Sequence, residues 1–420
     1  MRILHVLAQK PGQTGSGVYL LNIIRVAAQK GHKQCLVAGI GAGDADYQNL
    51  LPKEVTFIPV IFDVPELPFP VPGMSDDMPY PSTRYRDLTE QMYGLWCSAF
   101  TRALKVADSF APDLIIVHHL WLLAALVRNL FPGLKVLAVC HGTELRQLAT
   151  SRRFADQVIA GCRDMDRVLA LTVSQKQELM TSYGIHPDKI VVAGSGYNGE
   201  IFYPPTSEPL LESSSNKSIK ALYAGKLCAA KGVPALLKAI SHLPLGQEDF
   251  KLFLVGSGSG EEYSEIISLA EKCLFEVCLT GQLSQKQLAE LMRECRLFIF
   301  PSFYEGFSLV TLEALASGMW VVANSLPNLR DWIGKSLVQQ GIVEFTTLPR
   351  LRLVDIPYPE ELPAYEVRLS NAILKQIERI KQHGGAPATG WKETSRAYSW
   401  SAILNIIECA YQELAADNSH

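Results

Sequence analysis

Two glutamates, Glu305 and Glu313, flank the junction between a predicted strand and a predicted helix that begins near Ser308. The first turn of such a helix presents the free backbone N–H groups of Ser308, Leu309 and Val310 to an anion. Carboxylates accept hydrogen bonds from vicinal hydroxyls, so this segment suits an anionic, polyhydroxylated ligand. The alternative is that Glu313 is only a solvated helix residue. It lies in an otherwise apolar helix, however, where a charge usually has a partner.

Two lysines, Lys226 and Lys231, follow the apolar segment 219–224, which is predicted to be a strand. Ligands of open α/β folds bind at the carboxyl edge of the sheet. Two fixed cations at that edge would suit a diphosphate. The alternative is a pair of solvated lysines on a surface loop.

A glycine-rich turn, Gly12–Gly17, separates the first apolar segment from a helical pattern. Glycine permits close backbone approach, and a helix N-terminus attracts anions. The order of its glycines does not match a dinucleotide fingerprint, and no clear acidic partner follows about 20 residues later. A structural turn without a ligand therefore remains an alternative.

His141 and Gly142 end the apolar run that begins at Lys135. A lone histidine at a strand end is more often structural than catalytic, but this one is predicted at a ligand-binding edge. A second glycine-rich segment, 194–199, predicts a turn at the close of the first half.

The elements that position these residues form two similar halves. Short apolar segments alternate with helical patterns, which indicates parallel sheets covered on both faces. The predicted strands of the first half are 2–7, 35–38, 55–61, 114–117, 136–140 and 168–173. Those of the second half are 219–224, 252–255, 277–279, 297–300 and 320–323.

We therefore expect a Rossmann-like N-terminal domain at 1–203, a linker at 204–217 and a second Rossmann-like domain at 218–394. Residues 395–420 contain an amphipathic helix, Trp400–Leu414. The proline-rich segment Pro59–Pro81 can be neither a core strand nor a helix. It is predicted to be a long, partly ordered loop, either a specificity loop together with Arg84 and Arg86 or an ordinary surface loop.

The amino-acid composition excludes some functional classes of protein. A net charge of -3 argues against a dedicated nucleic-acid binder. The nine scattered cysteines are read as reduced, buried thiols of a cytosolic protein. No signal peptide or membrane span is visible, so we expect a cytoplasmic protein, at most peripheral to the inner face of a membrane. The acid pairs 44/46 and 164/166 are interpreted as surface acids, and no metal site is expected.

Taken together, these motifs resemble the family-4 retaining glycosyltransferases of the GT-B fold. The hallmark is a glutamate, seven residues and a second glutamate, which stands here as Glu305–Glu313. The order of the other motifs extends the similarity over nearly the whole chain: Gly15–Gly17, His141-Gly142, Asn198-Gly199, Gly225-Lys226, Lys231-Gly232, Leu254–Gly258, Thr280-Gly281 and Tyr398-Ser-Trp400.

The resemblance implies two facing α/β domains with an interdomain cleft and a C-terminal helix that returns to the first domain. It also implies a site for the diphosphate of a sugar-nucleotide donor. The residues of that site would be Gly15, Gly17, Lys226, Lys231, Ser308, Leu309 and Val310. The family usually has arginine at the first lysine, so Lys226 keeps the charge and loses the bidentate fork. The loop Leu326–Asp331 also departs from the family, which often has a Gly-Gly pair there.

The resemblance also implies a separate role for each of several other residues. Glu313 would bind the ribose, Glu305 the transferred sugar, and Gly256 and Leu283 would belong to the nucleotide pocket. His141 would approach the sugar near its 6-position, and His141, Lys231 and Glu305 form the implied catalytic set.

The resemblance also implies retention of configuration, with neither metal nor cofactor. We expect a hexose donor, UDP-glucose as a first choice, and a saccharide or lipid-linked saccharide acceptor in polysaccharide or glycoconjugate synthesis. Peripheral membrane contact would involve the N-terminal domain. Two alternatives remain at this point: an oxidoreductase built on two dinucleotide-binding halves, and a sugar-nucleotide-binding protein with degenerate catalysis.

Overall fold

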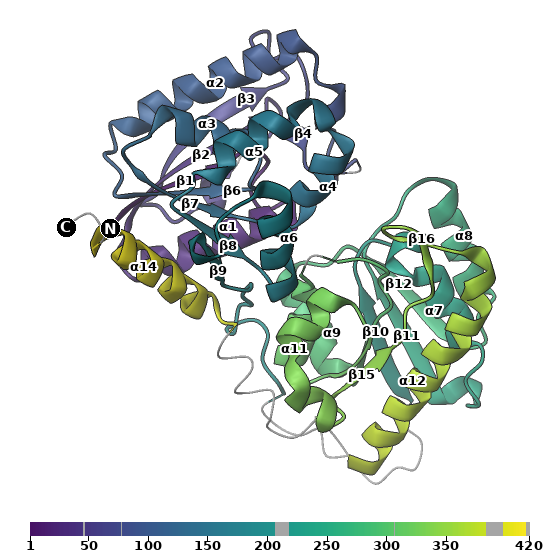
Figure 1. The fold of residues 1–420 in the computed structure, drawn as a ribbon. Helices are drawn as coiled ribbons and strands as arrows, with labels where there is room; N and C mark the ends of the chain where they lie inside the picture. Colours follow the sequence, from purple (N-terminus) through teal and green to yellow (C-terminus); the bar gives the residue numbers. More distant parts are fainter. Residues whose placement is uncertain (45–46, 77, 206–217, 306, 384–397, 417–420) are drawn as a thin grey trace. The chain divides into compact units, whose positions relative to one another are not determined.

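The computed structural model describes residues 1–44, 47–76, 78–205, 218–305, 307–383 and 398–416. It divides the chain into two compact units, each built on its own sheet (Figure 1). Unit 1 comprises Met1–Gly196 and Trp400–His420, and unit 2 comprises Tyr197–Ser399.

The sheet of unit 1 has seven parallel strands in the order β3-β2-β1-β6-β7-β8-β9. They are β1 (Arg2–Leu7), β2 (Lys33–Gly41), β3 (Thr56–Phe62), β6 (Leu114–His118), β7 (Lys135–Val139), β8 (Arg167–Ala170) and β9 (Ile190–Val192). A small parallel pair, β4 (Pro72–Gly73) and β5 (Thr83–Arg84), lies in the β3–α2 connection.

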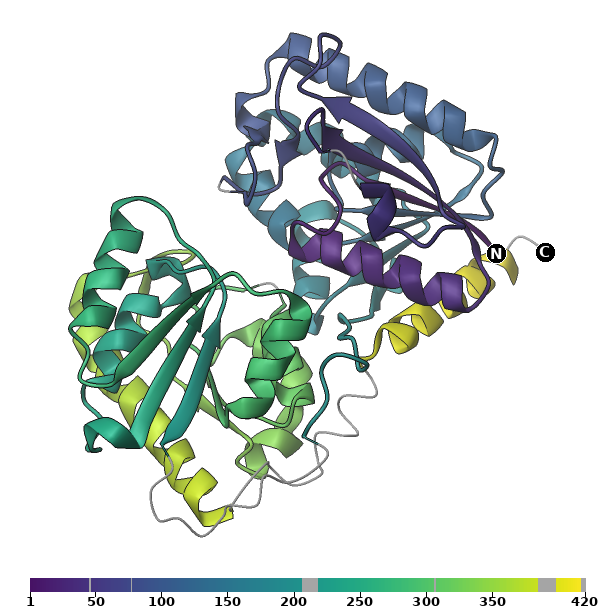
Figure 2. The ribbon, with the colours of Figure 1, turned by 180° about the vertical axis from the view of Figure 1, so that it is seen from behind.

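Helices cover both faces of this sheet. They are α1 (Gly15–Gln29), α2 (Glu90–Asp108), α3 (Leu122–Leu130), α4 (Thr143–Thr150), α5 (Ala155–Arg163), α6 (Val173–Tyr183) and α14 (Trp400–Ala416). Helices α1 and α14 lie side by side on one face, opposite the long helix α2 (Figures 1 and 2).

Helix α14 packs on unit 1, as the resemblance implied. Lys30 at the end of α1 hydrogen-bonds Asn405 and Glu408 of α14, and the Trp400 ring meets the Tyr19 ring edge-on at 5.0 Å. A side chain at Gly196 would collide with Trp400, because its Cβ would lie 2.5 Å from the indole ring.

Unit 2 carries a six-stranded parallel sheet in the order β12-β11-β10-β13-β14-β15. Its strands, with a separate antiparallel hairpin β16–β17, are β10 (Ile219–Ala224), β11 (Phe250–Val255), β12 (Glu276–Gly281), β13 (Leu297–Phe300), β14 (Trp320–Asn324), β15 (Val343–Thr346), β16 (Leu351–Leu353) and β17 (Ile356–Pro357).

Two helical layers enclose this second sheet. They contain α7 (Val233–Ile240), α8 (Gly260–Glu271), α9 (Gln285–Glu294), α10 (Leu309–Ala316), α11 (Pro327–Gln339) and α12 (Leu362–His383). Helices α7, α8 and α12 share one apolar core with the sheet, and α9, α10 and α11 share the other.

Several details differ from the sequence predictions. The strand predicted over 168–173 ends at Ala170, because the Thr172 side chain accepts the N–H of Gln175 and caps α6. The boundary predicted at 203 falls instead after Gly196, and Phe202 is buried in the core of unit 2. Most of the predicted linker, 206–217, and residues 384–397 lie outside the described residues.

The proline-rich segment is not a loosely attached loop. Its first residues belong to β3, where Pro59 is tolerated because β3 is an edge strand. Phe62, Leu67, Phe69 and Met74 are buried in the core of unit 1. Hydrophobic burial therefore fixes this segment despite its prolines.

All nine cysteines are free thiols, and five of them are buried. No helix within the described part of the chain is long and apolar enough to cross a membrane.

Candidate functional site

The predicted phosphate-binding residues of unit 2 lie at the point where the strand order reverses. Strands β10 and β13 are neighbours there, and their following loops carry Lys226, Lys231 and Glu305. In open α/β sheets, ligands bind outside the carboxyl ends of the strands at this switch point.

Glycines allow the strand-end loops of unit 2 to contact each other through their backbones. The Gly256 N–H donates to the carbonyl of Gly281 at 2.9 Å, and a Cβ on Gly256 would lie 1.9 Å from the carbonyl oxygen of Gly225. Gly256 also has a φ of 136°. Glycine is therefore required at position 256 by the loop itself.

The predicted nucleotide-pocket residue Leu283 is half-buried against the α9 side of the sheet.

Lys231 and Glu305 form an ion pair. The Lys231 Nζ lies 2.5 Å from a carboxylate oxygen of Glu305 and 3.4 Å from the carbonyl oxygen of Tyr304. Gly232 brings the two loops together, because a Cβ there would lie 2.2 Å from the carbonyl oxygen of Pro301. Two residues predicted separately from the sequence are thus in contact, a pairing that their spacing did not reveal.

Lys226 lies on the same loop as Lys231 and is exposed. Its backbone carbonyl accepts the hydroxyl of the buried Tyr223 at 2.7 Å. The loop that carries both lysines is therefore anchored to the sheet by Tyr223.

Two buried side chains that the sequence analysis missed hold the β13–α10 loop. The Asn324 amide, at the end of β14, donates to the carbonyls of Pro301 and Ser302 at 2.8 and 3.0 Å. The Tyr365 hydroxyl donates to the Asn324 side chain at 2.8 Å. A buried polar side chain at a strand end is the signal that would have pointed to Asn324.

A third missed residue, Asn328, lies in the segment Leu326–Asp331, where the sequence departs from the pattern of the family it resembles. The structure shows that this segment is not a loop, because α11 begins at Pro327 and Asn328 lies in its first turn. Its amide donates to the carbonyl oxygen of Glu305 at 3.0 Å. This departure from the family pattern therefore orients the backbone of the predicted catalytic glutamate.

The N-terminus of α10 presents backbone donors. The Ser308 hydroxyl accepts the N–H of Thr311 at 3.3 Å and caps the helix. No acceptor among the described residues bonds the N–H groups of Leu309 and Val310. These two groups and the helix dipole favour an anion at this end of the helix.

Glu313 lies inside α10 with 9% of its surface exposed. Its carboxylate has no hydrogen-bond partner within the described parts of the chain, and burial raises its pKa to about 8. The interpretation of Glu313 as a solvated helix residue is wrong. At neutral pH the group is mostly protonated and can both donate and accept hydrogen bonds.

Unit 1 holds the other predicted residues at its own switch point, between β1 and β6. The Gly12–Gly17 loop follows β1, and Thr14 caps α1 by accepting the N–H of Gly17 at 3.3 Å. A Cβ on Gly17 would lie 2.5 Å from the Gly12 nitrogen, whereas Gly15 faces open space. Gly17 is thus required by the loop, and Gly15 is the glycine that leaves room for a ligand.

His141 is not a lone histidine. It meets His118, the last residue of β6, and His119, which follows it, with ring centroids 5.5 and 4.8 Å away. The His141 Nε2 lies 3.2 Å from the His118 Nδ1. Burial, and then His119, lower the pKa of His141 to about 3, so its imidazole is neutral at physiological pH.

Glu144 ties this histidine cluster together. Its Oε1 atom accepts the backbone N–H groups of His141 and Leu120 at 2.8 and 3.2 Å and lies 3.3 Å from the Nδ1 atom of His119. Burial raises the pKa of Glu144, but His119, His141 and backbone donors outweigh that effect and lower it to about 2. An ionised carboxylate therefore joins the β6 and β7 loops.

His119 has a φ of 70°, which is unusual for a residue other than glycine. Its Nε2 lies 3.0 Å from the Gln9 side-chain oxygen, which also accepts the hydroxyl of Ser16 at 3.1 Å. Strained backbone held by buried bonds is found at functional sites. The sequence analysis missed His118 and His119, although two histidines directly after an apolar strand were a usable signal.

Of the predicted surface acids, Asp164 is exposed. Asp44 and Asp166 are partly exposed and form ion pairs, Asp44 with the buried Lys10 at 2.6 Å and Asp166 with Arg128 at 2.8 Å. Asp46 lies outside the described residues. Within the part of the chain that the structure describes, no three potential metal ligands come together.

Two family models match the chain. "Glycosyltransferase Family 4" matches residues 14–200, and "Glycosyl transferases group 1" matches residues 211–346. Together they include the predicted site residues of both units. The oxidoreductase alternative is therefore set aside.

Curated relatives include a D-inositol 3-phosphate glycosyltransferase of Xylanimonas cellulosilytica, which is 30% identical over 42% of this chain and 43% of its own length. An MMP alpha-(1->4)-mannosyltransferase of Mycolicibacterium hassiacum is 25% identical over 96% of this chain and 95% of its own length. The chain thus spans less than half of the first relative and nearly all of the second.

Solved structures of the same fold include a sucrose-phosphate synthase from Thermosynechococcus elongatus, with a TM-score of 0.71 and 18% identity over 99% of this chain and 100% of the other. Anabaena HepE, crystallised with UDP-glucose, has a TM-score of 0.68 and 15% identity over the same shares. These likenesses establish the GT-B fold.

Proposed function

Because the chain belongs to the family 4 glycosyltransferases of the GT-B fold, we propose that it transfers a hexosyl group from a nucleoside-diphosphate sugar to a saccharide acceptor. UDP-glucose is the proposed donor. The acceptor is a free or lipid-linked saccharide. A lipid-linked acceptor would bring the N-terminal domain to a membrane surface.

One observation carries this proposal. Unit 2 gathers a cation, Lys231, a carboxylate, Glu305, and two helix N–H groups that no described residue bonds, all at the switch point of its sheet. A diphosphate needs cations and helix N–H groups, and a sugar needs carboxylates for its hydroxyls. A sugar nucleotide combines both requirements.

The proposed reaction retains configuration and uses no metal ion. The bond from the anomeric carbon to the β-phosphate oxygen breaks, and the acceptor oxygen bonds to that carbon from the same face. The acceptor proton passes to the departing phosphate oxygen. Lys231, Lys226 and the N–H groups of Leu309 and Val310 stabilise the negative charge that develops on the diphosphate.

The geometry of the two glutamates supports a route without a covalent intermediate. Glu305 is paired with Lys231, and Glu313 is buried and proposed to bind the ribose. Neither carboxylate is then available as a nucleophile. The neutral His141 is proposed to hydrogen-bond the transferred sugar rather than to supply a charge.

A donor screen tests the function. The chain is incubated with UDP-, GDP- and ADP-sugars, with EDTA present, and the released nucleoside diphosphate is measured with and without saccharide acceptors. We expect release from UDP-glucose that depends on Lys231. If nucleoside diphosphate is released only from another nucleotide sugar, that sugar nucleotide replaces UDP-glucose as the donor. No release from any donor would favour the degenerate sugar-nucleotide-binding protein.

A further inference from the structure

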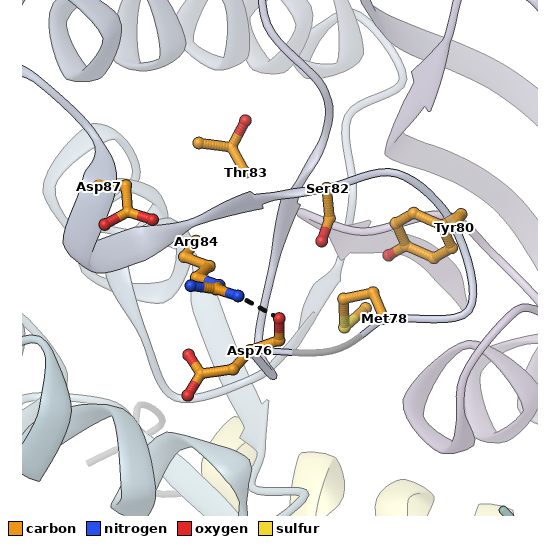
Figure 3. Close-up of a pocket in the computed structure, with 7 residues that line it drawn as sticks. All are labelled: Asp76, Met78, Tyr80, Ser82, Thr83, Arg84 and Asp87. Atoms are coloured by element: carbon orange, nitrogen blue, oxygen red, sulfur yellow. Dashed lines mark hydrogen bonds between the residues drawn. The ribbon is translucent and has the colours of Figure 1, made fainter. Parts of the chain in front are cut away.

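A cavity of about 400 Å³ lies in the β3–α2 connection of unit 1 (Figure 3). Its volume falls within the range of small-molecule sites. The residues that line it are Asp76, Met78, Tyr80, Ser82, Thr83, Arg84 and Asp87. None of these residues belongs to the predicted donor site.

The walls of this cavity are held by hydrogen bonds. The Thr83 hydroxyl donates to the carbonyl of Pro70 at 2.8 Å, and the Arg84 Nε donates to the carbonyl of Asp76 at 3.2 Å. The buried Gln147 of α4 donates to the carbonyl of Met74 at 3.0 Å. The segment is therefore anchored to the helix that follows His141.

Gln9 connects the cavity to the histidine cluster. Its amide nitrogen lies 4.0 Å from the Met78 sulfur, and its oxygen bonds both His119 and Ser16. One side chain thus contacts the cavity wall, the loop after β6 and the start of α1. Through Gln9 and His119, the cavity wall is thus connected to His141, the residue proposed to hydrogen-bond the transferred sugar.

The lining has the chemistry of a carbohydrate site. The carboxylates of Asp76 and Asp87 accept hydrogen bonds from hydroxyls, and the Arg84 guanidinium and the Ser82 hydroxyl donate them. Figure 3 shows the side chains of Asp76, Arg84 and Asp87 gathered on one side of the cavity. Tyr80 adds an aromatic ring, over which the Nζ of Lys10 lies 4.9 Å from the centroid.

The charges of the lining disfavour a phosphorylated ligand. Arg84 is the only cation among the described lining residues, which also include the carboxylates of Asp76 and Asp87. The neighbouring Arg86 is already paired with Asp76 at 3.3 Å. A phosphate group needs converging positive charge, and here it would meet one lining guanidinium beside the carboxylates of Asp76 and Asp87.

We propose that this cavity is the acceptor subsite and that it takes an uncharged sugar residue in preference to a phosphorylated one. This inference rests on the proposed function and narrows its acceptor class. It separates the protein from enzymes whose acceptor carries a phosphate.

Binding of saccharides to the full chain without any donor tests the subsite. Saturation-transfer NMR is recorded with methyl α-D-glucoside, maltose, glucose 6-phosphate and maltose 1-phosphate. We expect transfer to the neutral sugars, at least tenfold weaker binding of the phosphates, and loss of the signal in the Asp76→Asn/Asp87→Asn variant. The matched control is Asp188→Asn, a strongly exposed aspartate outside the cavity.

A charge reversal provides a second readout. Asp87→Lys should shift the preference toward the phosphorylated sugars by tenfold or more. Three outcomes would each overturn the assignment of this cavity as the acceptor subsite. They are the absence of saccharide binding, a preference of the unmodified chain for the phosphorylated sugars, and an unchanged signal in the Asp76→Asn/Asp87→Asn variant. Because no donor is present, these outcomes are independent of the donor screen, which tests the proposed function.

Discussion

Replacement of Glu313 by glutamine should stabilise unit 2 and weaken donor binding at the same time. Burial raises the pKa of this carboxyl from 4.5 to about 8. Between these two values the folded state holds one proton that the unfolded state has released. The free energy of unfolding therefore falls as pH rises from 4.5 to 8 and levels off above that.

The magnitude follows from the size of the shift. At pH 7 the unfolded carboxyl is ionised and the folded one is protonated, and the difference destabilises the fold by up to about 3 kcal/mol. Glutamine carries no such proton. Glu313→Gln should therefore raise the Tm of unit 2 by roughly 5–10 °C at pH 7, and by little near pH 4.5.

Donor binding should have the opposite dependence on pH. If the ionised Glu313 accepts the ribose hydroxyls, UDP-glucose binding must release its proton. Affinity should then rise about fivefold from pH 7 to pH 8, and calorimetry in buffers of different ionisation heat should detect the released proton. Glu313→Gln should bind the donor more weakly and without proton release.

The assays are thermal unfolding at several pH values and titration calorimetry with UDP-glucose, or with the donor that the screen selects. The matched control is Glu290→Gln, an exposed glutamate of α9 that should change neither quantity. An unchanged Tm at pH 7 in Glu313→Gln would refute the burial argument. A donor affinity that is flat between pH 6 and 8 would remove Glu313 from the ribose site.

The remaining predictions concern the loops of the two units. Lys231→Ala should lower donor turnover at least 100-fold with an unchanged Tm, because it removes charge stabilisation of the leaving diphosphate; near-normal turnover would exclude this role. Asn324→Ala should destabilise unit 2 by about 2 kcal/mol and raise the donor KM, because two carbonyls lose their donor; chemical denaturation and kinetics would detect both effects. Gly232→Ala should destabilise unit 2 by more than about 2 kcal/mol, because its φ of 71° and the carbonyl of Pro301 leave no room for a Cβ; an unchanged unfolding midpoint would contradict this. Because His141 is neutral, its protonation should cause no loss of turnover above about pH 4. A loss of turnover near pH 6.5 that is present in the parent chain and absent in His141→Ala would instead show that the His141 imidazole titrates at its ordinary pKa.

The apolar pattern of the sequence predicted strand positions correctly where both faces of a strand are buried. The predictions for β10 and β13 match the structure at both ends, because buried parallel strands form unbroken apolar runs. Strands β9 and β15, at the far edges of the two sheets, were missed. Strand β3 was foreseen, but the prolines from Pro59 onward concealed how much of the following segment is buried.

The sequence identified individual site residues but not their contacts. The pairing of Lys231 with Glu305 joins positions 74 residues apart, and spacing alone does not encode such a contact. The same holds for His119 and Gln9, which are 110 residues apart. Strand order brings these residues together, and it was recognisable only through resemblance to a family.

The return of α14 to unit 1 has a consequence for synthesis on the ribosome. Its contact between Lys30 and Glu408 joins residues 378 positions apart, with all of unit 2 encoded between them. At 5–20 residues per second, the face of α1 that α14 covers stays open for on the order of 10–40 s after Gly196 is made. The N-terminal unit is thus begun first and completed last, and during that interval Tyr19 lacks the indole ring that packs against it in the finished protein.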